Sequence, residues 1–257
     1  MPHTRSLLVV KFGGAALGTP GRIRRAARRV TTLRAKGHDL VIVASALGHA
    51  TDRLLAQFDK AIGHQPSAIS LRERDRLLAT GEDHAASLLA ATITSFGRAA
   101  RSLRGGEAGL LATGEFGAGV LQDLALSPLL DLLRAQVVPV VSGFQAIRLT
   151  DGETLTLGRG TSDLTAVFLA AKLGAAECHL VKDVDGVYDV DPNRFAEARR
   201  HDRLSYEALE RIAAEAEIVH PGAAALARER GVHLRIYGYK APVRVTEAHC
   251  TRVGEAA

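Results

Sequence analysis

Short apolar segments that alternate with longer helical patterns are the feature that most constrains the fold of this chain. The apolar runs lie at residues 7–10, 40–44, 109–112, 137–141, 179–181 and 234–237, and each is too short for a helix. Helical spacing of apolar residues recurs between them, at residues 20–35, 72–96, 121–135, 162–173 and 205–230, with a break at His220-Pro221. This alternation predicts an α/β fold with a mainly parallel sheet covered on both faces.

One hairpin signal interrupts the alternation. Between Gln145 and Thr156, two segments of alternating polarity flank Asp151-Gly152, a dipeptide typical of tight turns. We expect this hairpin at the rim of the sheet. The 257 residues fit one α/β domain, and no repeat, low-complexity tract or long linker divides them. A single domain is therefore expected to span residues 1–257.

The charge pattern favours a small-molecule ligand over nucleic acid. Lys and Arg number 33 against 28 Asp and Glu, and this net charge of +5 suits an anionic ligand or simply aids solubility. Arginines cluster at residues 22–29, where apolar residues at helical spacing predict that the arginines lie largely on a solvated face. Because no aromatic residues are interleaved to stack on bases, we expect no nucleic-acid binding.

The remaining composition predicts a cytoplasmic protein without a membrane partner. No segment approaches the ~20 apolar residues of a membrane span, and the first apolar run is too short for a signal peptide. Cys178 and Cys250 are the only cysteines and lie far apart. They suggest neither a disulfide framework nor a zinc site, and we expect no metal held by the protein's own ligands.

A lysine followed by paired glycines, Lys11-Phe12-Gly13-Gly14, ends the first predicted strand. Ligands of open α/β sheets bind at the carboxyl ends of strands. Glycines there let backbone N–H groups approach phosphate oxygens, and a lysine adds positive charge. A tight turn beside a surface lysine fits the same residues. Neither the P-loop, the dinucleotide-binding glycine pattern nor the protein-kinase motifs occur, so ATP would bind by another design.

Two further polar clusters follow strands. Residues 156–165 place an arginine, hydroxyls and a carboxylate at the start of a predicted helix. Ser162 or Asp163 can simply cap that helix; alternatively, Arg159 binds a substrate carboxylate while Asp163 orients a lysine or a substrate ammonium. Residues 181–192 run from a strand end into an acidic turn, where Lys182 and Tyr188 can hold a nucleotide's phosphate and base. A solvated loop or a metal loop fits this turn equally well.

The motifs together resemble those of the amino acid kinase family, and more narrowly its aspartate kinase branch. Besides the three clusters, the resemblance rests on residues 41–46 with Thr51-Asp52, on residues 77–82 ending in Glu82, and on Val219-His220-Pro221. Order and spacing match over about 210 residues. The resemblance implies a three-layer αβα sandwich with a mainly parallel central sheet, like that of carbamate kinase. It also implies an acceptor-binding part at about residues 1–150 and an ATP-binding part at about 151–257.

The resemblance implies roles for individual residues in an ATP-dependent kinase that converts a carboxylate to an acyl phosphate. For catalysis it implies Lys11, which would stabilise the transferring phosphoryl group, and Asp163, which would organise the reacting groups. Glu82 would face the ammonium group of an amino acid, and Arg159 would face its α-carboxylate. The residues implied for substrate binding are Ser45, Thr51, Glu82, Arg159 and Ser162. Ser45 would also lie beside the phosphates. The ATP set comprises Lys11, Gly13, Gly14, Lys182, Asp183 and Tyr188. Mg²⁺ would bridge the phosphates, and a homodimer is expected.

Departures from the family pattern leave two alternatives open. Ala15-Ala16 stands where the family has Thr-Ser, Lys182 precedes Asp183 in place of a threonine, and Asn193 replaces an arginine. Glu217 replaces a lysine that reaches the ATP phosphates, a charge reversal that weakens ATP binding unless Lys182 takes over the contact. The resemblance also stops before the family's ACT domains, so feedback control through them is not expected. The alternatives are a same-fold kinase for another small acceptor and a catalytically weak homologue that binds nucleotide or amino acid as a subunit.

Overall fold

Eight strands form the main sheet within the described residues of the protein, whose structure is a computed structural model. The structure describes residues 5–63, 70–190, 194–195, 197–216, 218–242, 245 and 249–255. The strand order is β10-β12-β11-β9-β1-β2-β6-β3. Within the described sheet, β11 and β12 form the only antiparallel pair, and the other neighbouring strands pair in parallel. The sheet is therefore mainly parallel, as expected. The strands are β1(Leu7–Phe12), β2(Asp39–Ala44), β3(Ala100–Leu103), β6(Val138–Ser142), β9(Glu177–Lys182), β10(Arg203–Ser205), β11(Leu234–Gly238) and β12(Thr251–Gly254).

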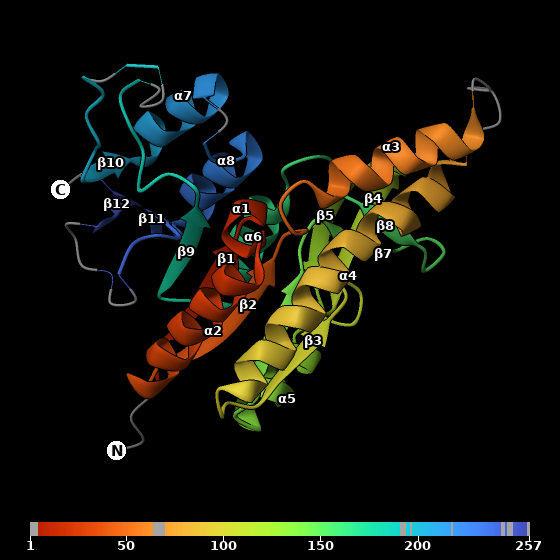
Figure 1. Ribbon diagram of the computed structural model, residues 1–257, viewed down its shortest axis with the longest axis horizontal. Helices are drawn as coiled ribbons and strands as arrows, with labels where there is room; N and C mark the ends of the chain where they lie inside the picture. The colour runs from red at the N-terminus through yellow and green to blue at the C-terminus, as the bar shows by residue number, and fades with distance from the viewer. Residues whose placement is uncertain are drawn as a thin grey trace.

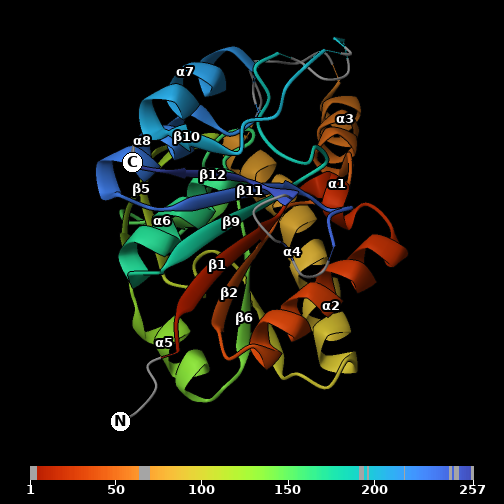
Figure 2. The same ribbon diagram turned by 90° about the vertical axis from the view of Figure 1, so that its left-hand side faces the viewer.

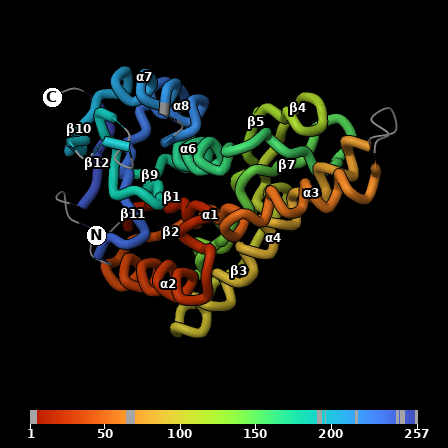
Figure 3. The backbone as a smooth tube through the Cα atoms, turned by 45° about the horizontal axis from the view of Figure 1, so that its top comes forward, coloured from red at the N-terminus to blue at the C-terminus, as the bar shows by residue number. Residues whose placement is uncertain are grey.

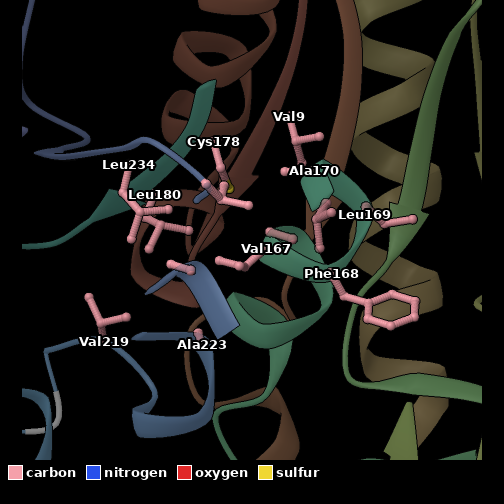
Figure 4. Packing of buried hydrophobic residues seen from close by; sticks show 14 of the residues in the cluster. Val9, Val167, Phe168, Leu169, Ala170, Cys178, Leu180, Val219, Ala223 and Leu234 are labelled. Carbon is pink, nitrogen blue, oxygen red and sulfur yellow. The ribbon is translucent and has the colours of Figure 1, made fainter. Parts of the chain in front are cut away.

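Helices cover both faces of this sheet (Figures 1 and 2). Successive side chains of a strand point to opposite faces, so Leu8 and Val10 of β1 pack against α2(Pro20–Ala35) and α4(Leu71–Ser95). Val9 packs on the other face in a cluster with α5(Ser127–Arg134), α6(Ser162–Leu173), α7(Tyr206–Ala216) and α8(Pro221–Arg230). Figure 4 shows this second cluster, in which Val9, Cys178 and Leu180 meet Val167 of α6 and Ala223 of α8. The expected αβα sandwich is confirmed.

The predicted hairpin is present, but its expected place at the rim of the main sheet is wrong. It pairs β7(Gln145–Arg148) with β8(Thr154–Thr156), and both belong to a separate four-stranded sheet. The other members of that sheet are β4(Leu110–Glu115) and β5(Ala118–Leu124). The chain leaves β6 through Gly143 and Phe144, which has a positive φ of 68°. This turn directs β7 toward β4, to which it pairs in parallel.

A buried carboxylate ties this second sheet to α4. Asp75, 1% exposed, accepts hydrogen bonds from the Thr156 N–H at 2.7 Å, the Thr156 hydroxyl at 2.9 Å and the Gly117 N–H at 2.9 Å. Buried carboxylates are stable when hydrogen bonds satisfy their oxygens. Asp75 thereby holds β8 three residues before Arg159.

The helix predicted at residues 121–135 is wrong in its first part, because residues 118–124 form β5 and the helix begins at Ser127. Pairing of β5 with β4 around the Gly117 turn overrides a spacing that also fits a helix. Two helices were not predicted: the short α1(Gly14–Leu17) and α3(Ala50–Ile62), which lies along α4 (Figure 3). None of the described helices is long and apolar enough to cross a membrane.

Candidate active site

A cleft of about 260 Å³ opens at the carboxyl ends of the central parallel strands. Lys11 comes from the end of β1, Ser45 follows β2, and Ser162 begins α6. Because parallel strands end at the same edge of a sheet, residues far apart in sequence meet there. The lining residues are Lys11, Gly14, Ser45, Ala46, Gly48, Thr51, Asp52, Glu82, Phe144, Arg159, Gly160 and Ser162. All five residues predicted for the amino-acid substrate therefore line one cleft.

Two lysines converge on one buried aspartate beside this cleft. The Lys11 ammonium lies 2.8 Å from Asp163 Oδ1, and the Lys182 ammonium donates to Asp163 Oδ2. The His220 backbone N–H also reaches Oδ2, at 3.3 Å. The carboxylate thus holds two cations at the ends of the neighbouring strands β1 and β9. The capping interpretation of Ser162 or Asp163 is wrong, because Thr161 is the N-cap residue of the described α6 and no side-chain cap hydrogen bond is present there.

The charged groups of this cluster shift one another's pKa values. Burial alone would raise the pKa of Asp163, but the two ammonium groups outweigh burial and hold the pKa below its usual value. Burial lowers the pKa of Lys182, and the attraction of Asp163 opposes that effect. Asp163 is therefore ionised at neutral pH. With both lysines protonated, the cluster carries a net charge of +1, which attracts an anion such as a polyphosphate.

The paired glycines bring two loops into direct contact. A Cβ at Gly14 would lie 2.7 Å from the Ala46 carbonyl oxygen and 2.9 Å from that of Gly48. The Gly48 N–H donates to the Gly14 carbonyl at 3.0 Å, and the Gly13 N–H donates to the Val181 carbonyl at 3.0 Å. Gly13 therefore joins β1 to β9, and Gly14 allows the loop after β2 to close one side of the cleft.

Glu82 presents a carboxylate to the cleft from the middle of α4. Its side chain is buried, with Oε1 accepting the Ala46 N–H at 3.1 Å. The other oxygen, Oε2, is buried and has no hydrogen-bond partner among the described residues. Burial raises the pKa of Glu82 to about 7. A cationic donor placed at Oε2 would satisfy this oxygen and favour the ionised form.

Arg159 reaches across the mouth of the cleft to an unexpected partner. Its guanidinium forms an ion pair with Asp52 in the first turn of α3, and His49 Nδ1 lies 3.4 Å from the same carboxylate. Hydrogen bonding from Arg159 lowers the pKa of Asp52, and the opposing effect of burial does not outweigh it. Both side chains are exposed, so the pair is weak and an anionic ligand can replace Asp52 on the arginine.

The residues predicted to bind the nucleotide do not all lie in one cleft, unlike those predicted to bind the amino acid. Asp183 and Tyr188 follow β9 but do not line the described cleft. The Tyr188 hydroxyl donates to Asp185 at 2.6 Å, and burial together with this hydrogen bond raises the Tyr188 pKa, the hydrogen bond contributing most. Their contact with a nucleotide stays a prediction. Glu217 and Asn193, the two departures nearest the expected ATP site, lie outside the described residues.

Sequence reasoning missed three contributors to the site. Asp52 was noted only as part of a motif, although it pairs with Arg159. Phe144 lines the cleft with an unusual positive φ that no sequence signal reveals. His220 was noted in the Val-His-Pro motif, and its backbone N–H contacts Asp163. The motif before Pro221 was the available signal, because a helix start offers unpaired N–H groups.

The αβα sandwich, with a cleft at the carboxyl ends of its parallel strands and two lysines held beside it by Asp163, places the chain in a class that comparison with known proteins identifies. The sequence profile of the Amino acid kinase family matches residues 6–238, and the chain belongs to this family. Among curated relatives, aspartokinase 2 of Bacillus subtilis is 41% identical over 231 residues, which is 90% of this chain and 55% of that protein. The chain spans about half the length of the curated relatives it matches.

Solved structures agree with this placement. The crystal structure of aspartate kinase from Synechocystis matches with a TM-score of 0.82 and 33% identity over 98% of this chain and 40% of that chain. Aspartokinase III of E. coli, solved in complex with aspartate and ADP, matches with a TM-score of 0.85 over 98% of this chain and 65% of that chain. At 22% identity the second match shows the shared fold.

Proposed function

We propose that this chain transfers the γ-phosphoryl group of ATP to the carboxylate of aspartate or a closely related amino acid, forming an acyl phosphate. The observation that carries the proposal is the charge arrangement of one cleft. Lys11 and Lys182 converge on Asp163 beside the cleft, while Glu82 and Arg159 line it with opposite charges. Relatives of this family named aspartokinases, at 41% and 38% identity, support the choice of acceptor.

The proposed reaction needs positioning and charge neutralisation rather than a covalent enzyme intermediate. A carboxylate oxygen of the acceptor attacks the γ-phosphorus, the bond from phosphorus to the β-γ bridging oxygen breaks, and ADP leaves. An acceptor carboxyl with a pKa near 4 is already ionised at neutral pH, so no base has to remove a proton. Lys11 and Lys182 would stabilise the charge on the phosphoryl oxygens and on the leaving ADP.

Mg²⁺ would enter the cleft with the nucleotide. The part of the chain that the structure describes contains no group of three or more His, Cys, Asp or Glu side chains suited to a metal. Mg²⁺ commonly uses substrate phosphates and water with one or two carboxylates, so such a group is not required. When bound, Mg²⁺ would neutralise charge on the phosphate oxygens.

The acceptor would be selected as a zwitterion. Glu82 Oε2, which has no partner in the described part of the chain, suits an ammonium group, and Arg159 suits an α-carboxylate through its planar fork of donors. Ser45, Thr51 and Ser162 add hydroxyls around the same space. A dicarboxylic acid without an amino group would leave Glu82 buried and unpaired, which disfavours it.

Lys182 is the residue we assign to the phosphate contact that Glu217 cannot make. Its ammonium is held by Asp163 beside Lys11, at the end of β9. The division into an acceptor part at about residues 1–150 and an ATP part at about 151–257 stays a prediction. The homodimer likewise stays a prediction, which light scattering of the purified chain would test.

The deciding experiment measures ADP release from Mg-ATP across a panel of amino acids and dicarboxylic acids, with hydroxylamine to trap an acyl phosphate. We expect aspartate-dependent ADP release with an equal amount of hydroxamate. Turnover with another acid alone would replace aspartate as the acceptor and keep the kinase. Nucleotide binding without any acceptor-dependent turnover would overturn the proposal in favour of a non-catalytic homologue.

A further inference from the structure

A second group of charged side chains lies at the opposite end of the sheet from the cleft. It lines a cavity of about 150 Å³ between the end of α2 and the first residues of β1, β9 and β11. Strand β9 begins here at Glu177 and ends at Lys182, so about 17 Å of strand separate the two places. Arg29, Lys36, Glu177, His179, Arg235 and Tyr237 are the polar residues on which the inference rests.

Arg29 is the exception within the arginine cluster that was expected largely on a solvated face. It is 1% exposed and lies on the inner side of α2. Its Nη2 donates to the Ala241 carbonyl at 2.9 Å, and its guanidinium lies 4.8 Å from the centre of the Tyr237 ring. Its Nη1 is buried without a hydrogen-bond partner among the described residues, and no described carboxylate forms an ion pair with it.

Glu177, the carboxylate in this cavity, already pairs with other side chains. The Glu177 carboxylate accepts a hydrogen bond from Arg235 Nη2 at 2.8 Å and lies 2.7 Å from Arg235 Nε. His179 Nε2 lies 3.1 Å from the same carboxylate. Burial would raise the pKa of Glu177, but these two partners hold it at about 2. Burial lowers the pKa of His179, which favours its neutral form. Glu177 and Arg235 therefore cancel, and no carboxylate of the described residues compensates the charge of Arg29.

A buried guanidinium without a counter-ion is costly, because desolvation is not repaid by attraction to an anion. The ring face of Tyr237 and the interaction of its hydroxyl with Arg29 offset part of this cost. The cavity has room for several water molecules, each of which needs ~10–15 Å³ by this measure. Lys36, exposed at the end of α2, adds a second positive charge to its lining. Among the residues that the structure describes, the cavity therefore combines free space, an Arg29 donor without a hydrogen-bond acceptor and an excess of positive charge.

We propose that this cavity is a second binding site, which takes a small oxyanion of phosphate or carboxylate type on Arg29 with Lys36 assisting. The guanidinium offers paired donors to such an ion. The site is distinct from the catalytic cleft, since it shares none of that cleft's lining residues. It does not depend on the proposed kinase activity.

The test follows amide hydrogen exchange of the whole chain in sodium phosphate, sodium acetate and sodium chloride at matched ionic strength. We expect phosphate, acetate or both to slow exchange in residues 29–38 and 234–238 more than chloride does. The two oxyanions tell which geometry the site prefers. Because phosphate can also enter the catalytic cleft, Lys11→Met is included and should leave this protection unchanged.

Two variants and a matched control locate the effect. Arg29→Met should raise the oxyanion concentration that gives half-maximal protection at least tenfold. Lys36→Met should raise it by about threefold. Lys36 is exposed, so its variant keeps the test valid if Arg29→Met disturbs folding. Arg24→Met, exposed on the same helix, should behave like the wild type. Equal protection by chloride, protection lost with Lys11→Met, or no effect of either cavity variant would overturn the inference.

Discussion

Replacing Glu82 with glutamine should stabilise the free protein in a way that depends on pH. Burial raises the pKa of this carboxyl from 4.5 to about 7. Since a tenfold change in an ionisation constant corresponds to about 1.4 kcal/mol, the cost of holding Glu82 ionised in the folded protein is about 3 kcal/mol. Glu82 is 4% exposed, so solvent screens little of this cost.

The pH window follows from the two pKa values. Below pH 4.5 the carboxyl is protonated in both the folded and the unfolded chain and contributes nothing. Between pH 4.5 and about 7 the unfolded chain releases the proton while the folded protein keeps it, so stability falls as pH rises. Above pH 7 the whole penalty is present. Glutamine never ionises, and the variant escapes the penalty.

The assay is denaturant unfolding of wild type and Glu82→Gln without substrate, at pH values from 4.5 to 8. The free energy of unfolding of the wild type, minus that of the variant, should fall by about 3 kcal/mol across this range. Glu115→Gln, an exposed carboxyl in β4, is the control and should give a flat difference. A flat difference for Glu82→Gln as well would refute the idea that burial raises its pKa.

Three further predictions concern the cleft. Lys182→Ala should lower kcat on the order of 10²-fold, because it would remove one of the two cations that we assign to the phosphoryl group. Steady-state kinetics that show unchanged turnover and ATP affinity would contradict the assignment. Gly14→Ala should lower the free energy of unfolding by about 1–3 kcal/mol, because its Cβ would meet two carbonyl oxygens. In the same unfolding experiments the control Gly21→Ala should be neutral or stabilising, because a Cβ at Gly21 would have no atom within 4 Å. Asp52→Asn should lower the KM for the amino acid by about two- to fivefold, since Asp52 competes for Arg159, and an increased KM in acceptor titrations would count against this competition.

Much of the fold and the substrate side of the site could be predicted from local patterns. Helices at residues 20–35 and 162–173 were predicted at their observed bounds, because their apolar spacing agrees with the face that they bury. Lys11 and Asp163 were also predicted together, although 152 positions separate them, from a resemblance and from the rule that parallel strands end at one edge. Where local pattern and tertiary packing agree, sequence alone is sufficient.

Only the tertiary structure decided which groups are paired and which are desolvated. The sequence does not show that Asp52 binds Arg159, that one Glu82 oxygen has no partner among the described residues, or that Arg29 alone of its cluster is buried. It also placed the hairpin in the wrong sheet. Such properties depend on contacts between distant segments and on the loss of water around each group. A local pattern contains neither, so the sequence determined the layers and the position of the cleft, while packing determined its charges.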